Sequence, residues 1–138
     1  MSKMVRELMH PGLITCRAET TLGDVASLLT THHVHALVVA DRDGRPLGII
    51  TDFDLLAAEW LSTDAESLAA MRKMTAGELM TSPVATIEST ARASEAAKRM
   101  VDEVIGRLMV VEGPKPVGVL SVSDLVAHMA DRKSTSLI

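Results

Sequence analysis

Residues 48–55 of the chain read GIITDFDL, and residues 118–125 read GVLSVSDL. Both stretches pass from an apolar run to a hydroxyl residue and then, three positions later, to an aspartate followed by a leucine. This pattern is typical of a strand that ends where a helix begins, with the hydroxyl residue as the helix N-cap. The same strand-to-helix junction is therefore predicted twice in one chain.

The two junctions belong to a longer internal repeat. Residues 7–9 and residues 78–80 both read ELM, and one constant offset, shortened by a single residue in the second half, aligns the rest. Self-similarity at this scale indicates that one supersecondary unit has been duplicated. Identical pairs in register include Thr15/Thr86, Ala26/Ala97, Leu37/Leu108, Val39/Val110, Pro46/Pro116, Asp54/Asp124 and Ala57/Ala127.

Each copy predicts the element order β-α-β-β-α, because short apolar runs rich in β-branched residues alternate with helical periodicity and with turns rich in Asp, Gly and Pro. We therefore expect an α/β (α+β) fold. In the first copy, strands are expected at 13–15, 36–40 and 47–50, with helices from 21 and over 52–60. In the second copy, strands are expected at 84–87, 108–111 and 117–120, with helices over 91–102 and 123–130.

One copy alone has too little core to be stable, so we expect the two to pack sheet against sheet as one pseudo-twofold module. The apolar residues of segment 62–74 recur at helical spacing and predict a linker helix. The expected boundaries are 3–61 for the first repeat, 62–74 for the linker helix, 75–131 for the second repeat and 132–138 for a flexible tail.

The composition is that of a globular protein. Of the 138 residues, 47% are hydrophobic and 23% charged, with a net charge of −4. The acidic balance and the presence of only two aromatic residues, Phe53 and Trp60, disfavour nucleic-acid binding. No apolar run approaches the roughly 18 residues of a membrane span, and the start lacks the apolar core of a signal peptide. A single cysteine, Cys16, suits a reducing compartment, so we expect a cytoplasmic protein with no membrane partner.

The junction motif has a structural and a functional interpretation. As a helix cap, Thr51 or Ser121 accepts a backbone N–H, the aspartate returns the bond, and the pair contributes about 0.5–2 kcal/mol. As a ligand site, the hydroxyl and the carboxylate of Asp54 or Asp124 share one face of the first helical turn. A carboxylate accepts two hydrogen bonds at once, which suits the vicinal hydroxyls of a ribose.

The surroundings of the motif fit the functional interpretation. The positive end of a helix dipole favours an anionic group beside the carboxylate. Gly48 and Gly118 lack a Cβ and so are expected to let a ligand approach the backbone. Ile14, Leu37 and Ile50 are expected to form apolar walls around a base.

Other constellations predict neither catalysis nor a metal site. His32, His33 and His35 form a short cluster, which we interpret as a polar helix end where cationic histidine suits the dipole; a zinc site completed by other His or Cys side chains is the alternative. The chain contains no nucleophile elbow, Walker loop, H-E-x-x-H or G-x-G-x-x-G motif. We expect a non-catalytic protein that requires no cofactor.

Over about residues 3–131, the chain resembles a tandem CBS-domain pair, or Bateman module. The resemblance rests on the two repeats, on the Glu-Leu-Met openings that lead to Pro11 and Pro83, and on the Gly-x-x-Thr/Ser-x-x-Asp junctions. It implies two β-α-β-β-α units packed through their sheets and often dimerised into a disk. It also implies regulatory binding of adenosyl ligands (AMP, ADP, ATP or S-adenosylmethionine) in clefts between the repeats, and a protein partner that responds to occupancy. The alternative is a ligand-free structural module for dimerisation or protein interaction.

The resemblance also implies roles for residues at matching positions. Asp54 and Asp124 would bind ribose, Thr51 and Ser121 would lie at the ribose-phosphate edge, Thr15 and Thr86 would contribute to the base pocket, and His35 and Arg107 would line the clefts.

The chain departs from the family pattern near both motif aspartates. Phe53 and Ser123 stand where a basic residue is frequent. Asp52 adds a negative charge beside any phosphate at the first junction, whereas Arg107 and Lys115 favour the second junction as the phosphate site.

Overall fold

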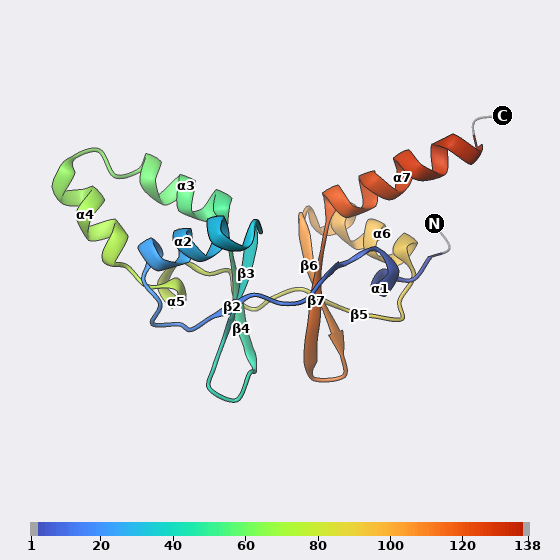
Figure 1. Cartoon of the computed structure of the whole chain (residues 1–138), viewed down its shortest axis with the longest axis horizontal. Helices are drawn as coiled ribbons and strands as arrows, with labels where there is room; N and C mark the ends of the chain where they lie inside the picture. Colours follow the sequence, from blue (N-terminus) through green and yellow to red (C-terminus); the bar gives the residue numbers. More distant parts are fainter. Residues whose placement is uncertain (1–2, 137–138) are drawn as a thin grey trace. The chain divides into compact units, whose positions relative to one another are not determined.

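The computed structural model describes residues 3–136, which form two compact units (Figure 1). The first unit consists of Ile14–Val84. The second unit combines Met1–Leu13 with Ala85–Ile138. The compact units therefore differ from the sequence repeats in one respect. Each repeat begins with a segment, here called its opening segment (residues 3–13 and 75–84), that belongs to the other repeat's unit.

The first unit is a three-stranded sheet with helices. The sheet order is β2-β3-β4, with β2 parallel to β3 and β3 antiparallel to β4. Its buried core includes Leu22, Val25 and Leu29 from α2 and Leu37 and Ile50 from the paired strands. The elements are β2 (Thr15–Cys16), α2 (Leu22–His32), β3 (Ala36–Ala40), β4 (Pro46–Thr51), α3 (Asp52–Trp60), α4 (Ala65–Lys73) and α5 (Ala76–Leu79).

The second unit is a four-stranded sheet with helices, in the order β1-β7-β6-β5. Its core joins Val5 of α1 to Ala96 and Met100 of α6 and to Leu108 and Leu120 of the paired strands. The elements are α1 (Val5–Leu8), β1 (His10–Pro11), β5 (Thr86–Glu88), α6 (Ala93–Glu103), β6 (Arg107–Glu112), β7 (Lys115–Ser121) and α7 (Val122–Ser136).

The two central hairpins have the same register. Val39 pairs with Gly48 in the first unit, and Val110 pairs with Gly118 in the second. Each hairpin has one register shift at the matching place, after Val39 and after Val110. The duplication predicted from the sequence is therefore present at the level of individual strand pairs.

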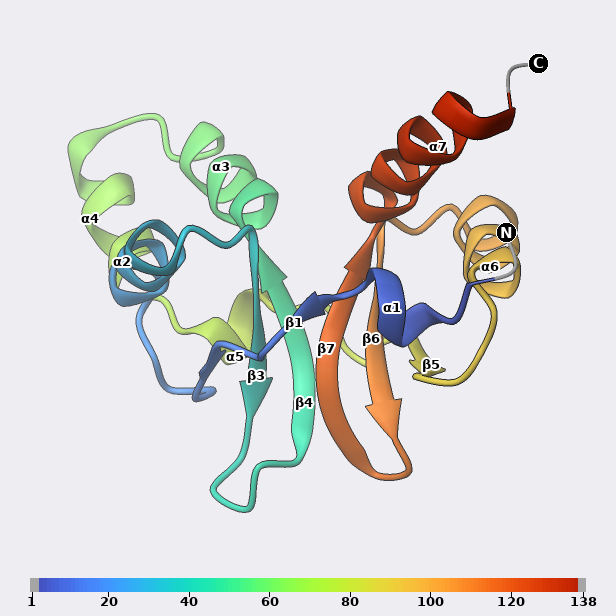
Figure 2. The ribbon, with the colours of Figure 1, turned by 45° about the vertical axis from the view of Figure 1, so that its right-hand side comes forward.

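The opening segments attach to their units through backbone hydrogen bonds. In the second unit, the Val5 N–H donates to the Ala91 carbonyl at 2.8 Å, and Figure 2 shows α1 near α6 and the paired strands. In the first unit, the Ala76 N–H donates to the Thr20 carbonyl at 2.7 Å, and the Leu22 N–H donates to the Met74 carbonyl at 2.8 Å. The short elements α1, β1 and α5 arise in these segments, and the sequence patterns did not predict them.

The segment 62–74 contains a helix, as the sequence predicts, whereas the end of the last helix differs from the expectation. The predicted linker segment contains α4, and this helix contacts α2 and α3 of the first unit. The last helix, α7, was expected to end near Ala130 and instead continues as helical backbone to Ser136, into the segment predicted to be a flexible tail. Residues 137–138 of that segment lie outside the described residues.

Candidate functional site

The α3 junction begins where β4 ends. Thr51 is the last residue of β4 and the N-cap of α3. Its N–H donates to Oδ2 of Asp54 at 2.9 Å, and the Asp54 N–H donates to Oγ1 of Thr51 at 3.1 Å. These reciprocal bonds form the capping box predicted from the sequence and hold both half-buried side chains in place.

The α7 junction repeats this geometry with serine. The Ser121 N–H donates to Oδ2 of Asp124 at 2.8 Å, and the Asp124 N–H donates to Oγ of Ser121 at 3.2 Å. The Ser121 hydroxyl also donates to Oδ2 of Asp124 at 3.0 Å. The hydroxyl thus accepts from one group and donates to another, which fixes the serine rotamer.

In each of the two junction carboxylates, one oxygen accepts no hydrogen bond from the described residues. Within residues 3–136, every hydrogen bond recorded to Asp54 or Asp124 through its carboxylate goes to Oδ2, and none goes to Oδ1. Both side chains are half-buried, so the capping bonds fix their orientation while solvent still reaches part of each. An oriented carboxylate with a free oxygen can accept hydrogen bonds from the hydroxyls of a ligand.

The other expected site residues of the first unit lie at different distances from its junction. His35 directly precedes β3, and its carbonyl accepts the Asp52 N–H at 2.9 Å, so it adjoins the junction. Thr15 pairs with Val38 and lies on β2, on the far side of β3 from Thr51. The structure therefore brings His35 to the junction and places the exposed Thr15 two strands away from it.

The second unit repeats this arrangement. Arg107 is the cross-strand partner of Ser121, and the exposed Thr86 lies on β5, on the other side of β6. The carbonyl of Thr86 accepts a hydrogen bond from the Arg99 guanidinium, which also donates to Glu103 at 3.0 Å. The Arg99 contact with Thr86 was not predicted; the only sequence signal is the i,i+4 spacing of Arg99 and Glu103.

Gly48 and Gly118 have a different role from the one expected. A Cβ built on Gly48 would lie 2.5 Å from Sδ of Met80, and one on Gly118 would lie 2.6 Å from Sδ of Met9. The space beside each glycine is thus filled by the opening segment of the unit. The expectation that these glycines admit a ligand to the backbone is wrong, because protein atoms already occupy the approach.

The expected apolar walls also have a different role. Leu37 and Ile50 pair across β3 and β4 and are both 0% exposed. Ile14 is partly buried and packs against the same core cluster. Leu37 and Ile50 therefore form the core and offer no surface to a base.

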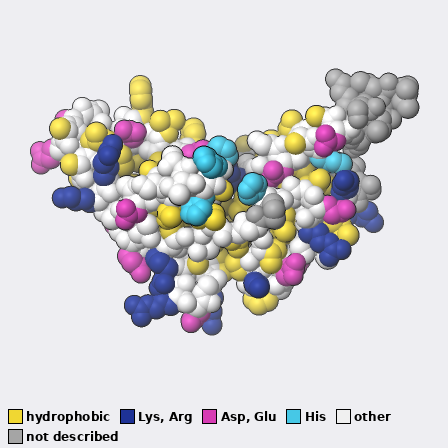
Figure 3. Space-filling view, in the orientation of Figure 1, with side chains coloured by type: hydrophobic (Ala, Val, Ile, Leu, Met, Phe, Trp, Pro, Cys, Tyr) yellow, Lys and Arg dark blue, Asp and Glu magenta, His cyan; other side chains and the backbone are white. Residues whose placement is uncertain are grey.

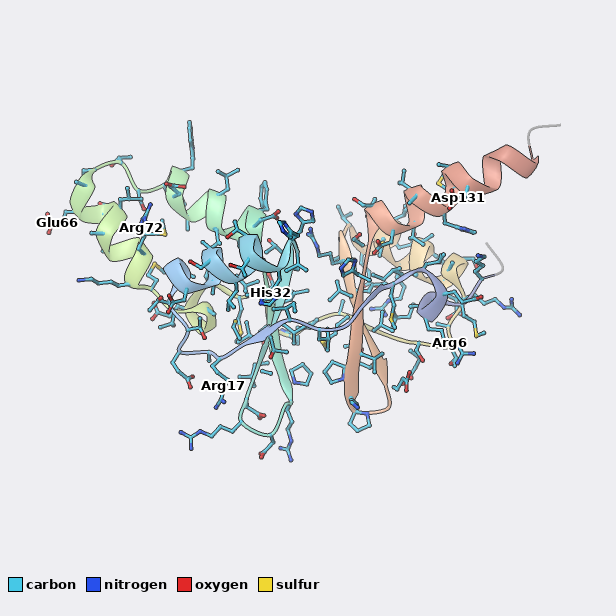
Figure 4. All side chains as sticks on the ribbon, viewed as in Figure 1. Arg6, Arg17, His32, Glu66, Arg72 and Asp131 are labelled. Carbon is cyan, nitrogen blue, oxygen red and sulfur yellow. The ribbon has the colours of Figure 1, made fainter. Side chains whose placement is uncertain are left out.

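The three histidines lie at the end of α2 and between α2 and β3. His32 is the last residue of α2 and is labelled in Figure 4. His33 adopts the left-handed conformation that ends this helix, with φ 53°, and Nδ1 of His35 lies 2.9 Å from Oδ2 of Asp52. Over the described part of the chain, no three His, Cys, Asp or Glu side chains gather as metal ligands would.

Burial raises the pKa of the Cys16 thiol, and a hydrogen bond with Thr20 partly offsets this rise.

The surface has no concentrated basic area on the face shown in Figure 3, where Lys and Arg side chains alternate with acidic ones. Searching residues 3–136, we find no helix both long enough and apolar enough to span a membrane.

Comparison with known proteins identifies the family. The sequence model of the CBS domain matches residues 5–60 and again residues 76–131, so the chain belongs to the CBS domain family. A CBS domain-containing protein of Dictyostelium discoideum is 33% identical over 135 residues, covering 91% of this chain and 90% of that protein. An uncharacterized protein of Methanocaldococcus jannaschii is 27% identical over 149 residues, and the match covers 97% of this chain but only 34% of that protein.

Solved CBS-domain structures share the fold. The crystal structure of the CBS domain pair of protein MJ0100, in complex with 5′-methylthioadenosine and S-adenosyl-L-methionine, has a TM-score of 0.81 and 24% identity, covering 96% of this chain and 100% of that one. The crystal structure of CBSX2 in complex with AMP has a TM-score of 0.77 and 24% identity, covering 96% and 99% of the two chains. The α/β fold and the family resemblance predicted from the sequence are thereby confirmed.

Proposed function

We propose that this protein is a non-catalytic regulatory module that binds an adenosyl ligand, either an adenine nucleotide (AMP, ADP or ATP) or S-adenosylmethionine. Asp54 and Asp124 would accept hydrogen bonds from the ribose hydroxyls, with Thr51 and Ser121 beside them. The ligand acts as a signal, so no cofactor is needed. The proposed setting is the cytoplasm, where the single thiol stays reduced.

The observation that carries the proposal is the Oδ1 of each junction aspartate, to which no described residue donates a hydrogen bond. Oδ2 is held by backbone N–H groups at 2.9 Å in Asp54 and 2.8 Å in Asp124. Each carboxylate is therefore oriented before a ligand arrives, which lowers the entropy lost on binding. Thr15, Thr86, His35 and Arg107 are proposed as further contacts. The adenosyl ligands of MJ0100 and CBSX2 support this ligand class.

The proposed mechanism is a shift between conformations of the chain or of its assembly. A ligand changes such an equilibrium only by its differential affinity for the two states. A protein partner that contacts the module would then read occupancy as a change of surface.

The test combines a thermal-shift screen with calorimetry. AMP, ADP, ATP and S-adenosylmethionine are screened first, because a ligand that binds only the native state raises Tm. Asp54→Ala and Asp124→Ala should each weaken binding at one junction about tenfold or more, since a charged hydrogen-bond acceptor is lost. Asp64→Ala is the matched control, because it removes an aspartate cap from α4, a helix that begins at neither junction. Unchanged binding in both junction variants would overturn the proposal.

A second candidate is a ligand-free module for dimerisation, and exposed apolar side chains favour it. Phe53, Leu56 and Trp60 of α3 are 70%, 63% and 83% exposed. Their spacing places them along one stripe of the helix, and contiguous exposed apolar surface marks interaction sites. A homodimer is compatible with both candidates. Analytical ultracentrifugation of the wild type and of Leu56→Glu tests the dimer, and a flat ligand screen at millimolar concentration would favour the ligand-free candidate.

A further inference from the structure

The first N–H groups of α3 are already occupied. The Asp52 N–H donates to the His35 carbonyl at 2.9 Å, the Phe53 N–H donates to Oδ1 of Asp52 at 2.8 Å, and the Asp54 N–H donates to Oγ1 of Thr51 at 3.1 Å. These are the groups with which a helix N-terminus binds a phosphate. At the α3 junction a side-chain carboxylate has taken the place of such an anion.

That carboxylate is held from a second direction. Oδ2 of Asp52 lies 2.9 Å from Nδ1 of His35, and the Asp52 side chain is 51% exposed. This contact with the imidazole orients the carboxylate. Asp52 thus presents a fixed negative charge beside Thr51 and Asp54.

The α7 junction lacks this carboxylate. Val122 occupies the position of Asp52, and its N–H donates to the Gly106 carbonyl at 3.0 Å, as Asp52 donates to His35. The Asp124 N–H donates to Ser121. Among the described residues, no acceptor is recorded for the Ser123 N–H, the counterpart of the occupied Phe53 N–H.

The α7 junction also gains a positive charge. Arg107 pairs with Ser121 across β6 and β7, in the same register in which Ala36 pairs with Thr51 across β3 and β4. Cross-strand partners project from the same face of a sheet with Cβ atoms about 4.5–5.5 Å apart. The Arg107 side chain therefore leaves the sheet beside Ser121, whereas the methyl group of Ala36 lies at the matching place beside Thr51.

We propose that Asp52 makes the α3 junction exclude phosphate-bearing ligands. AMP and related nucleotides then bind at the α7 junction, and the α3 junction takes adenosyl compounds whose 5′ group is neutral or cationic. This inference rests on the proposed function, because it concerns which ligand each junction selects.

The test uses variants that retain one junction each. Asp124→Ala leaves the α3 junction and Asp54→Ala leaves the α7 junction. Calorimetry with adenosine and with AMP, which differ only in the phosphate, gives the ratio of the two Kd values for each. We expect the Kd of AMP relative to adenosine to be about tenfold higher in Asp124→Ala, because the phosphate dianion meets a like charge at short range.

Exchanging the two residues should exchange the selectivity. In the Asp124→Ala protein, Asp52→Val or the near-isosteric Asp52→Asn should lower the ratio about tenfold and leave the adenosine Kd within about threefold. In the Asp54→Ala protein, Val122→Asp should raise it. Asp24→Asn removes an equal charge from an exposed position of α2 and should leave the ratio unchanged.

The outcomes separate the two proposals. If adenosine binds and neither Asp52 variant changes the ratio, charge selection by Asp52 is overturned while the adenosyl site stands. If the wild type binds neither adenosine nor AMP, nor any other adenosyl compound, the proposed function fails and takes this inference with it.

Discussion

Sδ of Met80 lies 2.5 Å from the point where a side chain on Gly48 would begin. The Thr81 carbonyl lies 2.7 Å from the same point, and a backbone ladder between Ile49 and Thr81 holds it there at 2.9 and 3.1 Å. Met9 stands in the same relation to Gly118. The Glu-Leu-Met opening and the junction glycine occur together in both repeats because the opening segment crosses β4 or β7 at the position of the glycine.

Gly48→Ala should therefore destabilise the protein by about 1–3 kcal/mol, as overpacking of a well-filled site does. The Met80 side chain can move aside, but the Thr81 carbonyl cannot move without breaking the hydrogen bond that it accepts from the Ile49 N–H. The double variant Gly48→Ala/Met80→Ala should for that reason not recover wild-type stability in urea unfolding. Gly106→Ala is the control, since a Cβ there meets no atom within 4 Å, and wild-type stability of Gly48→Ala would contradict the packing argument.

The exchanged opening segment gives a second prediction. Val5 is 0% exposed and packs in the core of the second unit, although it begins the first repeat. Val5→Ala should cost about 1–3 kcal/mol through lost burial and a cavity. Hydrogen exchange should speed up in Thr86–Glu88 and Arg107–Glu112, not in Ala36–Ala40, which is closer in sequence.

Val25→Ala is the matched control for that experiment. Val25 is also a valine at 0% exposure, but it lies in the core of the first unit. Its truncation should accelerate exchange in Ala36–Ala40 and leave the strands of the second unit protected. The reverse pattern in either variant would show that each opening segment packs with its own repeat and not with the other one.

The repeated elements could be predicted because their signals are local. Thr51 and Asp54 are three residues apart, and the hairpins carry their own turn residues, so spacing alone predicts the caps and the strands. The four-residue helices α1 and α5 are too short to show a hydrophobic period, and they are fixed by long-range bonds such as Val5 to Ala91. No local pattern states which repeat an opening segment will join.

The surroundings of the two junctions were harder to predict than the caps themselves. Glycine and leucine, the residue types at positions 48 and 37, occur both in ligand pockets and in protein cores. Only the packing of the folded chain decides which of these two roles Gly48 and Leu37 have. Leu37 proved to be fully buried and Gly48 to be covered by Met80. The pairing of His35 with Asp52 joins residues 17 apart in sequence, and it depends on the hairpin register that brings Ala36 opposite Thr51.

The caps can be tested separately from any ligand. Thr51→Ala removes the acceptor of the Asp54 N–H and should cost about 0.5–2 kcal/mol in ligand-free unfolding. Thr51→Ser retains the hydroxyl and copies the residue found at Ser121, so it should keep most of this stability. Equal loss in both variants would indicate that the threonine methyl group, and not the cap, is what stabilises the junction.

Cys16 should react slowly in the folded protein. The side chain is 5% exposed, and burial raises the pKa of its thiol. Both the access of a reagent to the sulfur and the fraction of thiolate at neutral pH are therefore reduced. Alkylation by iodoacetamide at neutral pH should be at least about tenfold slower than in urea-unfolded protein. A Cys16→Ala/Thr31→Cys protein, with its cysteine on an exposed position of α2, should react quickly without urea.

The stability of the protein should depend on Asp64 in acid. Asp64 caps α4, and Oδ1 accepts the Ser67 N–H at 2.7 Å, which holds the pKa of the carboxyl below its ordinary value. The unfolded chain therefore protonates this group at a higher pH than the folded chain does, and the contribution of Asp64 is present above about pH 4 and lost as pH falls through the folded-state pKa.

Asp64→Asn retains a capping oxygen that does not titrate. We expect the wild type to lose free energy of unfolding relative to Asp64→Asn as the pH is lowered from 7 through the acid range, measured by urea unfolding at each pH. The difference should level off below the folded-state pKa, where both forms of the residue are neutral. A difference that stayed constant from neutral to acid pH would show that the Ser67 bond does not discriminate between the charged and the protonated carboxyl.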